Sequence, residues 1–319
     1  MKNLQKPPVA IFGLGRMGAQ IARRLHKRGF KVVAWNRSPD PIKAIRRAGI
    51  FGTNDVAEAV ARITDAAKKA RMPRIFWIML PHAITHEFIL GREHLGRYLK
   101  KGDIVIDGGN SFYEDSVKLA AKLKSKGVHF FDCGTSGGVW GEKNGFALMV
   151  GGPENKWPVI EPIMKALSAG DNYGWLGKAG AGHFTKMVHN GIEYGMMEAI
   201  GEGYAVLEAG GFDLDLAKVT RIYQKGSVVR SWLIDLCRNI FETEDLSKVS
   251  GKVDASGEGE WTVKTAKKLG VDARVIEDAL KVRMESADPK AQKKFSNKMV
   301  ALMRKQFGGH AVHAKSKKY

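Results

Sequence analysis

The sequence is poor in the features that mark secreted, membrane-spanning and metal-binding proteins. Its 319 residues include only two cysteines, Cys133 and Cys237, which lie far apart and match neither a disulfide pattern nor a zinc-binding spacing. No stretch approaches the roughly 20 continuous apolar residues that cross a bilayer, and the N-terminal residues have no apolar signal core. We therefore expect a cytoplasmic protein with no metal site and no membrane partner.

Acidic residues are scarce relative to basic ones. The chain has 33 Asp and Glu against 52 Lys and Arg, which gives a formal net charge of +19. Such an excess of positive charge can bind nucleic acids or polyanionic small molecules, or it can form a basic surface that binds neither. Because no recognisable nucleic-acid-binding module accompanies the charge, we expect no nucleic-acid partner, and the purpose of the excess stays open.

A glycine-rich turn near the N-terminus predicts a dinucleotide site. The apolar run Val9–Phe12 reads as a buried strand, a helix-like segment follows from Ala19, and Lys31–Trp35 reads as a second strand. In this pattern the first glycine makes the tight turn, the second admits pyrophosphate, and the third lets helix and strand pack closely. The turn consists of Gly13, Leu14, Gly15, Arg16, Met17 and Gly18.

The end of the second strand bears on the choice between NADP and NAD. An NAD site usually has an acidic residue there, which accepts a hydrogen bond from the ribose 2′-hydroxyl. This chain has Asn36, Arg37 and Ser38 instead. Arg37 and Ser38 suit a 2′-phosphate, which favours NADP. NAD remains the alternative, with Arg37 merely exposed and Asp40 turned inward.

Further strands predict an α/β Rossmann-type domain over residues 1–180, with a mostly parallel, doubly wound sheet. The expected strands are 74–80, 103–107, 129–133 and 147–150. Ligands bind beyond the carboxyl ends of such strands. Several candidate ligand-binding residues follow these ends, namely Met79, Leu80, Asn110, Ser136, Gly137 and Gly138. Ordinary turn chemistry explains Asn110 or the 136–138 motif equally well when either is taken alone.

The second half of the chain reads as an all-α domain over residues 181–319, ending in a basic tail. Strand-like runs largely stop after Gly182, and Gly210-Gly211 is a typical end for the first long helix. The predicted helices are 181–209, 214–224, 228–241, 262–269, 272–284 and 289–307.

A chemically varied stripe occupies the first of these helices. Lys186, His189, Asn190, Glu193 and Tyr194 have the spacing i, i+3, i+4, i+7, i+8, which places them on one helical face. A core-facing stripe should be apolar, so the mixture favours a pocket. A solvated face is the simpler reading of an isolated helix, and the glycine-rich motifs upstream shift the balance towards a pocket.

Together these motifs resemble the decarboxylating 6-phosphogluconate dehydrogenase family, in a short form with one copy of the helical domain. The resemblance also extends to the broader β-hydroxyacid dehydrogenases. The matching segments are Gly13–Gly18, Asp107–Ser111, Ser136–Gly138, Lys186–Tyr194, Gly259–Thr262, Arg283 and Arg304–His310. The segment Lys186–Tyr194 is the part specific to the narrower family.

The resemblance implies oxidation of 6-phosphogluconate at C3, loss of CO₂ and protonation of the enediol at C1, giving ribulose 5-phosphate and reduced NADP, a step of the pentose phosphate pathway and of gluconate use. Lys186 is the expected general base. It must be neutral to accept the C3 hydroxyl proton, so burial or nearby cations should lower its pKa. Glu193 is the expected acid at C1 and must hold a proton near neutral pH. This pair needs no metal.

The resemblance also implies which residues bind the two ends of the substrate. The residues expected to bind the carboxylate and hydroxyl end are Asn110, Ser136, Gly137, Gly138, His189 and Asn190. The residues expected to bind the phosphate end are Tyr194, Arg283 and Ser256. Arg304 and His310 are expected to reach into a neighbouring subunit's site, which implies a homodimer or homotetramer with shared active sites.

Two departures from the family pattern keep other functions open. Ser256 and Glu258 replace a lysine and a threonine, which weakens the expected grip on phosphate. One alternative is another β-hydroxyacid dehydrogenase that acts on a small 3-hydroxy acid without phosphate. The other is a non-catalytic nucleotide- or polyanion-binding protein, although it leaves the retention of both Lys186 and Glu193 unexplained.

Overall fold

The computed structural model describes residues 6–254 and 257–312, and the chain divides into two compact units, Met1–Lys186 and Met187–Tyr319. The division falls inside one continuous helix, α8 (Ala181–Ala209), rather than in a linker. The expected domain ranges 1–180 and 181–319 therefore remain predictions. No helix in the described ranges is both long enough and apolar enough to cross a membrane.

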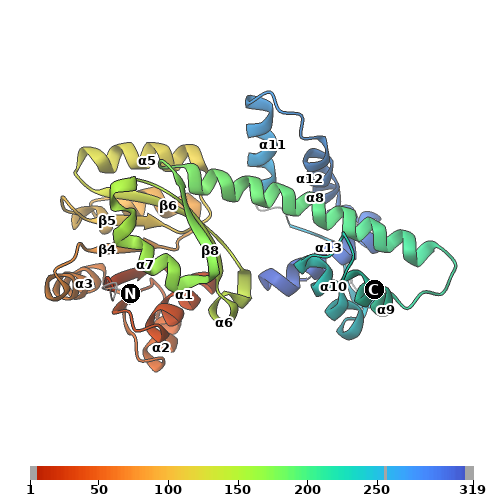
Figure 1. Ribbon diagram of the computed structural model, residues 1–319, viewed down its shortest axis with the longest axis horizontal. Coiled ribbons are helices and arrows are strands. Elements are labelled where there is room, and N and C mark those ends of the chain that lie inside the picture. Colours follow the sequence, from red (N-terminus) through yellow and green to blue (C-terminus); the bar gives the residue numbers. More distant parts are fainter. Residues whose placement is uncertain (1–5, 255–256, 313–319) are drawn as a thin grey trace. The chain divides into compact units, whose positions relative to one another are not determined.

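The N-terminal unit is built on an eight-stranded sheet with the order β3-β2-β1-β4-β5-β6-β7-β8 (Figure 1). Neighbouring strands are parallel except for β6 and β7. The strands are β1 (Val9–Phe12), β2 (Val32–Trp35), β3 (Phe51–Thr53), β4 (Ile75–Ile78), β5 (Ile104–Asp107), β6 (His129–Ser136), β7 (Phe146–Gly151) and β8 (Ser168–Gly177). The predicted Rossmann-type sheet is confirmed.

Helices cover both faces of this sheet, because its central strands are apolar on both sides. The helices are α1 (Arg16–Lys27), α2 (Pro39–Arg47), α3 (Val56–Ala70), α4 (His82–Leu90), α5 (Tyr113–Ser125), α6 (Gly141–Asn144) and α7 (Trp157–Leu167), with short 3₁₀ turns η1 (Leu95–Arg97), η2 (Gly138–Trp140) and η3 (Glu154–Lys156). One core cluster joins α1, α2 and α7 to the sheet, and a second joins α3, α4 and α5 to its other face. This is the predicted doubly wound arrangement.

The strands differ from the predicted ones in two respects. β3 and β8 lie outside the predicted strands, and β6 continues three residues past the predicted end at Cys133. The extension has a tertiary cause, since Gly134, Thr135 and Ser136 pair with β7 in antiparallel register.

The C-terminal unit is helical around a single apolar cluster. Besides α8 it contains α9 (Leu216–Tyr223), α10 (Trp232–Thr243), α11 (Glu258–Lys268), α12 (Arg274–Glu285) and α13 (Phe295–Gly308), with 3₁₀ turns η4 (Leu246–Lys248) and η5 (Ala291–Lys293). The all-α prediction is confirmed, and α8 has the predicted bounds.

Candidate active site

The glycine-rich turn between β1 and α1 has the shape that a dinucleotide requires. Gly13 has a φ of +102°, and a side chain there would overlap the carbonyl of Met79. A side chain at Gly18 would overlap the carbonyl of Gly13, whereas the space beside Gly15 is open. The first turn of α1 contains no acidic residue and no side-chain cap among the described contacts, so its N–H groups can bind phosphate. These residues fit a nicotinamide dinucleotide.

Asn36 at the end of β2 holds the glycine-rich turn in place. Its Oδ1 accepts a hydrogen bond from the Leu14 N–H at 2.8 Å, and its Nδ2 donates to the Ser38 carbonyl at 3.1 Å. Arg37 and Ser38 are exposed beside it. The Asp40 carboxylate is 87% exposed and pairs with Lys43 at 3.3 Å. Asp40 thus contacts Lys43, and Arg37 and Ser38 remain accessible to a ligand.

The next strand ends bring further predicted residues to the same edge of the sheet. Ile78 and Asp107, the last residues of β4 and β5, are paired in register, so Met79 and Leu80 lie beside the loop that contains Asn110. The buried Asp107 carboxylate shapes this loop by accepting from the Gly109 N–H at 3.0 Å and the Ser111 hydroxyl at 2.8 Å. Asn110 is left exposed at the tip.

The β6 strand positions both the 136–138 motif and the start of α8. Its buried Asp132 accepts hydrogen bonds from the N–H groups of Gly180 at 2.7 Å and His183 at 2.8 Å. Two residues further along, a side chain at Gly134 would overlap Cβ of Lys186. The absence of a side chain at Gly134 therefore lets the predicted base pack directly on the strand that ends at Ser136.

The middle of α8 is fitted closely to α11. A side chain at Gly191 would lie 2.6 Å from Cγ2 of Thr262, and one at Gly259 would lie 2.5 Å from the Tyr194 ring. The Thr262 hydroxyl donates to the Met187 carbonyl at 2.8 Å. The segment Gly259-Glu-Trp-Thr262 therefore packs directly against the part of α8 that contains the stripe.

Three predicted residues of α8 lie within a short distance of one another. Nδ1 of His189 is 2.9 Å from Oδ1 of Asn190 and 3.9 Å from the Glu193 carboxylate. Asn190 is buried, and His189 and Glu193 are half-buried. His189 is thus placed to orient the Asn190 amide and, when protonated, to pair with Glu193.

Two arginines and a tyrosine form a buried cationic group in the C-terminal unit. The Arg283 guanidinium lies 3.3 Å from the centre of the Tyr194 ring, and none of its three nitrogens has a hydrogen-bond partner among the described residues. Burial and Arg283 lower the pKa of Arg304. Arg283 and Arg304 are 2% and 7% exposed. A buried guanidinium without hydrogen-bond partners is costly, so Arg283 in this group fits an anionic ligand.

The C-terminal predicted residues pack within their own chain. Arg304 donates to the Asp254 carbonyl at 2.7 Å, and Nδ1 of His310 lies 3.1 Å from the Arg304 carbonyl. The reason is the position of Arg304 on the buried face of α13, next to Met303. The expected role of both residues in a neighbouring subunit stays a prediction, and Ser256 lies outside the described residues.

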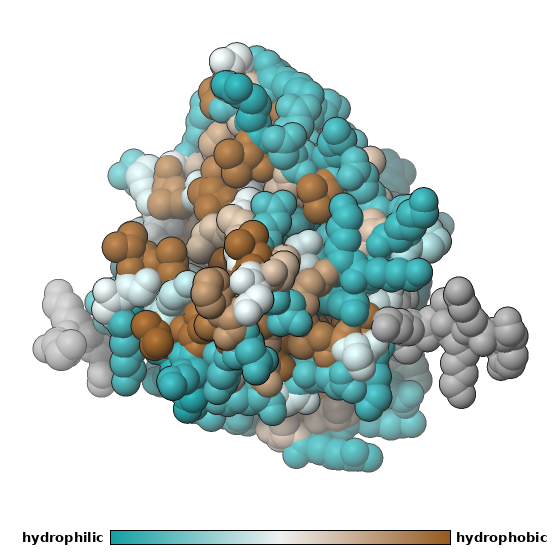
Figure 2. All heavy atoms as spheres, turned by 90° about the vertical axis from the view of Figure 1, so that its right-hand side faces the viewer, coloured by the Kyte–Doolittle hydropathy of each residue, from teal (hydrophilic) through white to brown (hydrophobic). Residues whose placement is uncertain are grey.

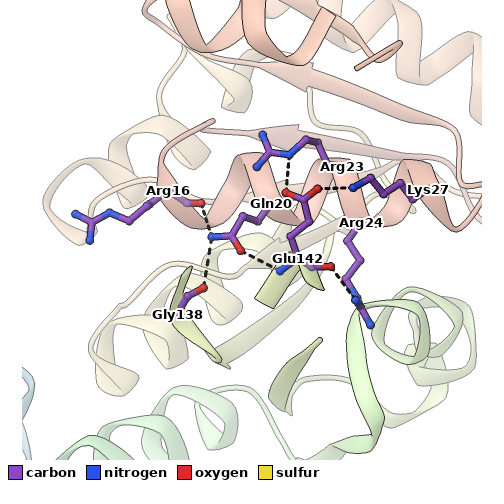
Figure 3. A network of polar contacts seen from close by, with 7 residues as sticks. All are labelled: Arg16, Gln20, Arg23, Arg24, Lys27, Gly138 and Glu142. Carbon is purple, nitrogen blue, oxygen red and sulfur yellow. Dashed lines mark hydrogen bonds and ion pairs between the residues drawn. The ribbon is translucent and has the colours of Figure 1, made fainter. Parts of the chain in front are cut away.

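Sequence reasoning overlooked a polar contact between α1 and α6 and a buried glutamate on α8. The first involves Gln20, Arg24 and Glu142, drawn in Figure 3. The second is Glu198, whose pKa burial raises to about 7. Across the described ranges, no group of three or more His, Cys, Asp or Glu side chains is placed to hold a metal ion.

Comparison with known proteins accounts for nearly the whole chain. Residues 8–177 match the NAD binding domain of 6-phosphogluconate dehydrogenase, and residues 182–318 match the C-terminal domain of 6-phosphogluconate dehydrogenase. The chain is 38% identical over 308 residues to the putative 6-phosphogluconate dehydrogenase YqeC of Bacillus subtilis, covering 96% of this chain and 99% of that one. It is 37% identical over 310 residues to the NAD(+)-dependent, decarboxylating 6-phosphogluconate dehydrogenase of Haloferax volcanii, with the same coverage.

Among solved structures, the 6-phosphogluconate dehydrogenase of Plasmodium falciparum is similar, with a TM-score of 0.79 and 28% identity. The match covers 88% of this chain but 62% of that chain, which is described in complex with NADP+ and with 6-phosphogluconate. The 3-hydroxyisobutyrate dehydrogenase of Mycobacterium tuberculosis matches with a TM-score of 0.71 at 20% identity, which indicates a shared fold.

Proposed function

The chain belongs to the 6-phosphogluconate dehydrogenase family, and from this premise we propose that it converts 6-phosphogluconate to ribulose 5-phosphate and CO₂ while reducing a nicotinamide dinucleotide. The observation that carries the proposal is α8, one continuous helix on which Lys186 and Glu193 lie two turns apart. The family matches support it, because one ends shortly before this helix and the other contains nearly all of it.

Lys186 is the proposed base for the C3 hydroxyl. When bound, the dinucleotide supplies a hydride acceptor for C3 of the substrate. Lys186 takes the hydroxyl proton at its Nζ and, once protonated, polarises the new C3 carbonyl while CO₂ leaves. Its packing on Gly134 supports this role, because the base of the side chain is held against β6.

Glu193 is the proposed acid that protonates C1 of the enediol after CO₂ has left. The carboxyl must carry a proton at that step and recover one afterwards. His189 lies 3.9 Å from it and is half-buried, which suits a group that returns a proton from solvent. Asn190, oriented by His189, is proposed to bind a substrate hydroxyl. Asn110 and Ser136–Gly138 are proposed to bind the carboxylate end.

Arg283 is the proposed anchor for the substrate phosphate, with Tyr194 beneath its guanidinium. The unpaired nitrogens of this buried side chain support an anionic ligand, and guanidinium groups bind phosphate in a bidentate manner. Arg304 adds a second buried cation beside Arg283. These groups favour a phosphorylated substrate over a small 3-hydroxy acid without phosphate.

We propose NADP as the preferred cofactor. Arg37 and Ser38 are exposed where a 2′-phosphate would be bound, and the nearby Asp40 contacts Lys43. The Haloferax volcanii relative is NAD(+)-dependent, so NAD is the alternative to be measured.

Both cysteines are buried free thiols, which is consistent with the proposed cytoplasmic location.

A homodimer or homotetramer is proposed from the surface of the C-terminal unit. Figure 2 shows apolar side chains gathered on one face of this unit. Its exposed apolar residues include Val206, Phe212, Ile222, Val228, Trp232 and Val275. Exposed apolar patches of this kind mark association surfaces. Light scattering on the purified protein should give a mass of two or four chains, and a monomer would contradict the proposal.

The activity is tested by following the absorbance of the reduced nicotinamide after 6-phosphogluconate is added. Parallel reactions with NADP and NAD measure the cofactor preference, and 3-hydroxyisobutyrate serves as the unphosphorylated comparison. Turnover with 6-phosphogluconate and release of CO₂ are expected. Turnover of the unphosphorylated acid alone would replace the proposed substrate.

A further inference from the structure

The α1 helix carries a polar stripe that the proposed function does not use. Gln20, Arg23, Arg24 and Lys27 have the spacing i, i+3, i+4, i+7 and therefore share one face of the helix. All four contact the segment formed by η2 and α6, which lies more than a hundred residues away in the chain (Figure 3). Ile21 and Leu25 on the same helix are buried in the core beside the sheet.

The stripe holds Glu142 at three separate points. Its backbone N–H donates to Oε1 of Gln20 at 2.9 Å, and its carbonyl accepts from Arg24 at 2.9 Å. Its carboxylate pairs with Arg23 at 2.6 Å and Lys27 at 2.7 Å. Burial alone would raise the pKa of this carboxyl, but the hydrogen bonds from Lys27 and Arg23 outweigh burial and lower it. Position and orientation of the first turn of α6 are therefore set by α1.

Gln20 is the member of the stripe that reaches the 136–138 motif. The amide of Gln20 is buried, and its Oε1 accepts a hydrogen bond from the Glu142 N–H. Its Nε2 donates to the Arg16 carbonyl at 3.0 Å and to the Gly138 carbonyl at 3.4 Å. Only a side chain with both a donor and an acceptor can make these contacts at once. Arg16, its helical neighbour, belongs to the turn expected to bind pyrophosphate.

The segment that Gln20 holds begins with two glycines whose backbone conformation is unusual for other residues. Gly137 and Gly138 have φ values of +132° and +54°; Gly137 connects β6 to η2, and Gly138 is the first residue of η2. Glycines at such positions permit several backbone conformations. Ser136 is held by its pairing with Ala147 of β7, so the anchor at Glu142 acts on the direction of the two glycines that follow it.

We propose that Gln20 is a positioning residue for substrate binding, which fixes the Ser136–Gly138 loop to the helix that binds the cofactor phosphates. Gln20 touches neither ligand and acts through Gly138 and Glu142. The inference rests on the proposed role of Ser136–Gly138 in binding the carboxylate end of 6-phosphogluconate. Arg24 is not an equivalent probe, because it also donates to the Ala166 and Ser168 carbonyls.

The test is a Gln20→Met substitution, which keeps the length of the side chain and removes its hydrogen bonds. We expect the KM for 6-phosphogluconate to rise at least fivefold, with the KM for the cofactor changing less than twofold. Hydrogen exchange in the absence of ligands should accelerate in peptides covering 137–145 and remain unchanged in peptides covering the turn at 13–18. Gln224→Met, at a half-buried glutamine bonded to Asp235, is the matched control and should behave as wild type.

A second variant, Gln20→Glu, keeps the acceptor for Glu142 but sets a carboxylate oxygen against the Gly138 carbonyl, and the same changes are expected. Unchanged exchange at 137–145 in both variants would overturn the anchoring role. Faster exchange with an unchanged KM for 6-phosphogluconate would overturn the link to substrate. If wild type does not oxidise 6-phosphogluconate, the proposed function fails and the link to substrate falls with it, while the exchange result still decides the anchor.

Discussion

Replacing Glu198 by glutamine should make the C-terminal unit more stable at alkaline pH. Glu198 lies on α8, is 6% exposed, and its Oε2 has no hydrogen-bond partner within the described part of the chain. Burial raises its pKa from 4.5 to about 7, with Arg283 opposing the rise and Glu202 adding to it. Glutamine has the shape of the protonated carboxyl and cannot ionise.

The sign and size of the effect follow from proton binding. Between about pH 4.5 and 7 the folded protein binds this proton and the unfolded chain does not, so the free energy of unfolding falls as pH rises. The pKa of Glu198 differs by about 2.5 between the unfolded and the folded protein. Each pKa unit corresponds to about 1.4 kcal/mol, so the free energy of unfolding falls by about 3 kcal/mol by pH 8. Glu198→Gln should therefore be more stable than wild type by about 3 kcal/mol at pH 8, and by little at pH 4.5.

The measurement is urea unfolding at a series of pH values from 4.5 to 8, followed by circular dichroism and fitted to the transition of the helical unit. Glu208→Gln, at an exposed glutamate near the end of α8 that does not contribute to the raised pKa of Glu198, is the control and should keep the wild-type pH dependence. If Glu198→Gln and wild type lose stability in parallel as pH rises, the argument from burial is refuted.

Three further substitutions test the proposed chemistry. Lys186→Met should lower kcat by about 1,000-fold with cofactor binding largely kept, as loss of a general base predicts; near-normal kcat would remove Lys186 from that role. Arg283→Met should raise the KM for 6-phosphogluconate by about 10- to 100-fold, as loss of a charged hydrogen bond to phosphate predicts, and an unchanged KM in a folded variant would place the phosphate elsewhere. Arg37→Leu should lower the ratio of kcat/KM for NADP to that for NAD by about tenfold or more, and an unchanged ratio in initial-rate assays would assign the preference to other residues.

Much of the fold was predictable because the signals are local. The turn Gly13–Gly18 sits between an apolar strand and a helix, and α8 ends at paired glycines, so both were found from sequence. β3 is a three-residue strand, Phe51–Thr53, and is too short to show a period. β8 mixes glycines, polar residues and a few apolar ones without alternation, and its strand conformation depends on pairing with β7.

The site was predictable where residues of one helix act together, and less so where distant segments meet. The stripe from Lys186 to Tyr194 is visible as spacing alone, although its role stays a prediction. The α1 stripe containing Gln20 has equally regular spacing, but nothing in the sequence identifies Glu142 as its partner. The burial of Glu198 depends on the packing of other helices around α8, which a helical pattern does not specify.

The fit between α8 and α11 has a consequence for how this sequence can diverge. Gly191 faces Thr262 and Gly259 faces Tyr194, each pair with no room for another methyl group. A larger residue at either glycine becomes acceptable only if its opposite number shrinks or moves in the same lineage. Substitutions at these four positions should therefore be epistatic, and an engineer who transplants α8 from a homologue should bring the matching turn of α11 with it.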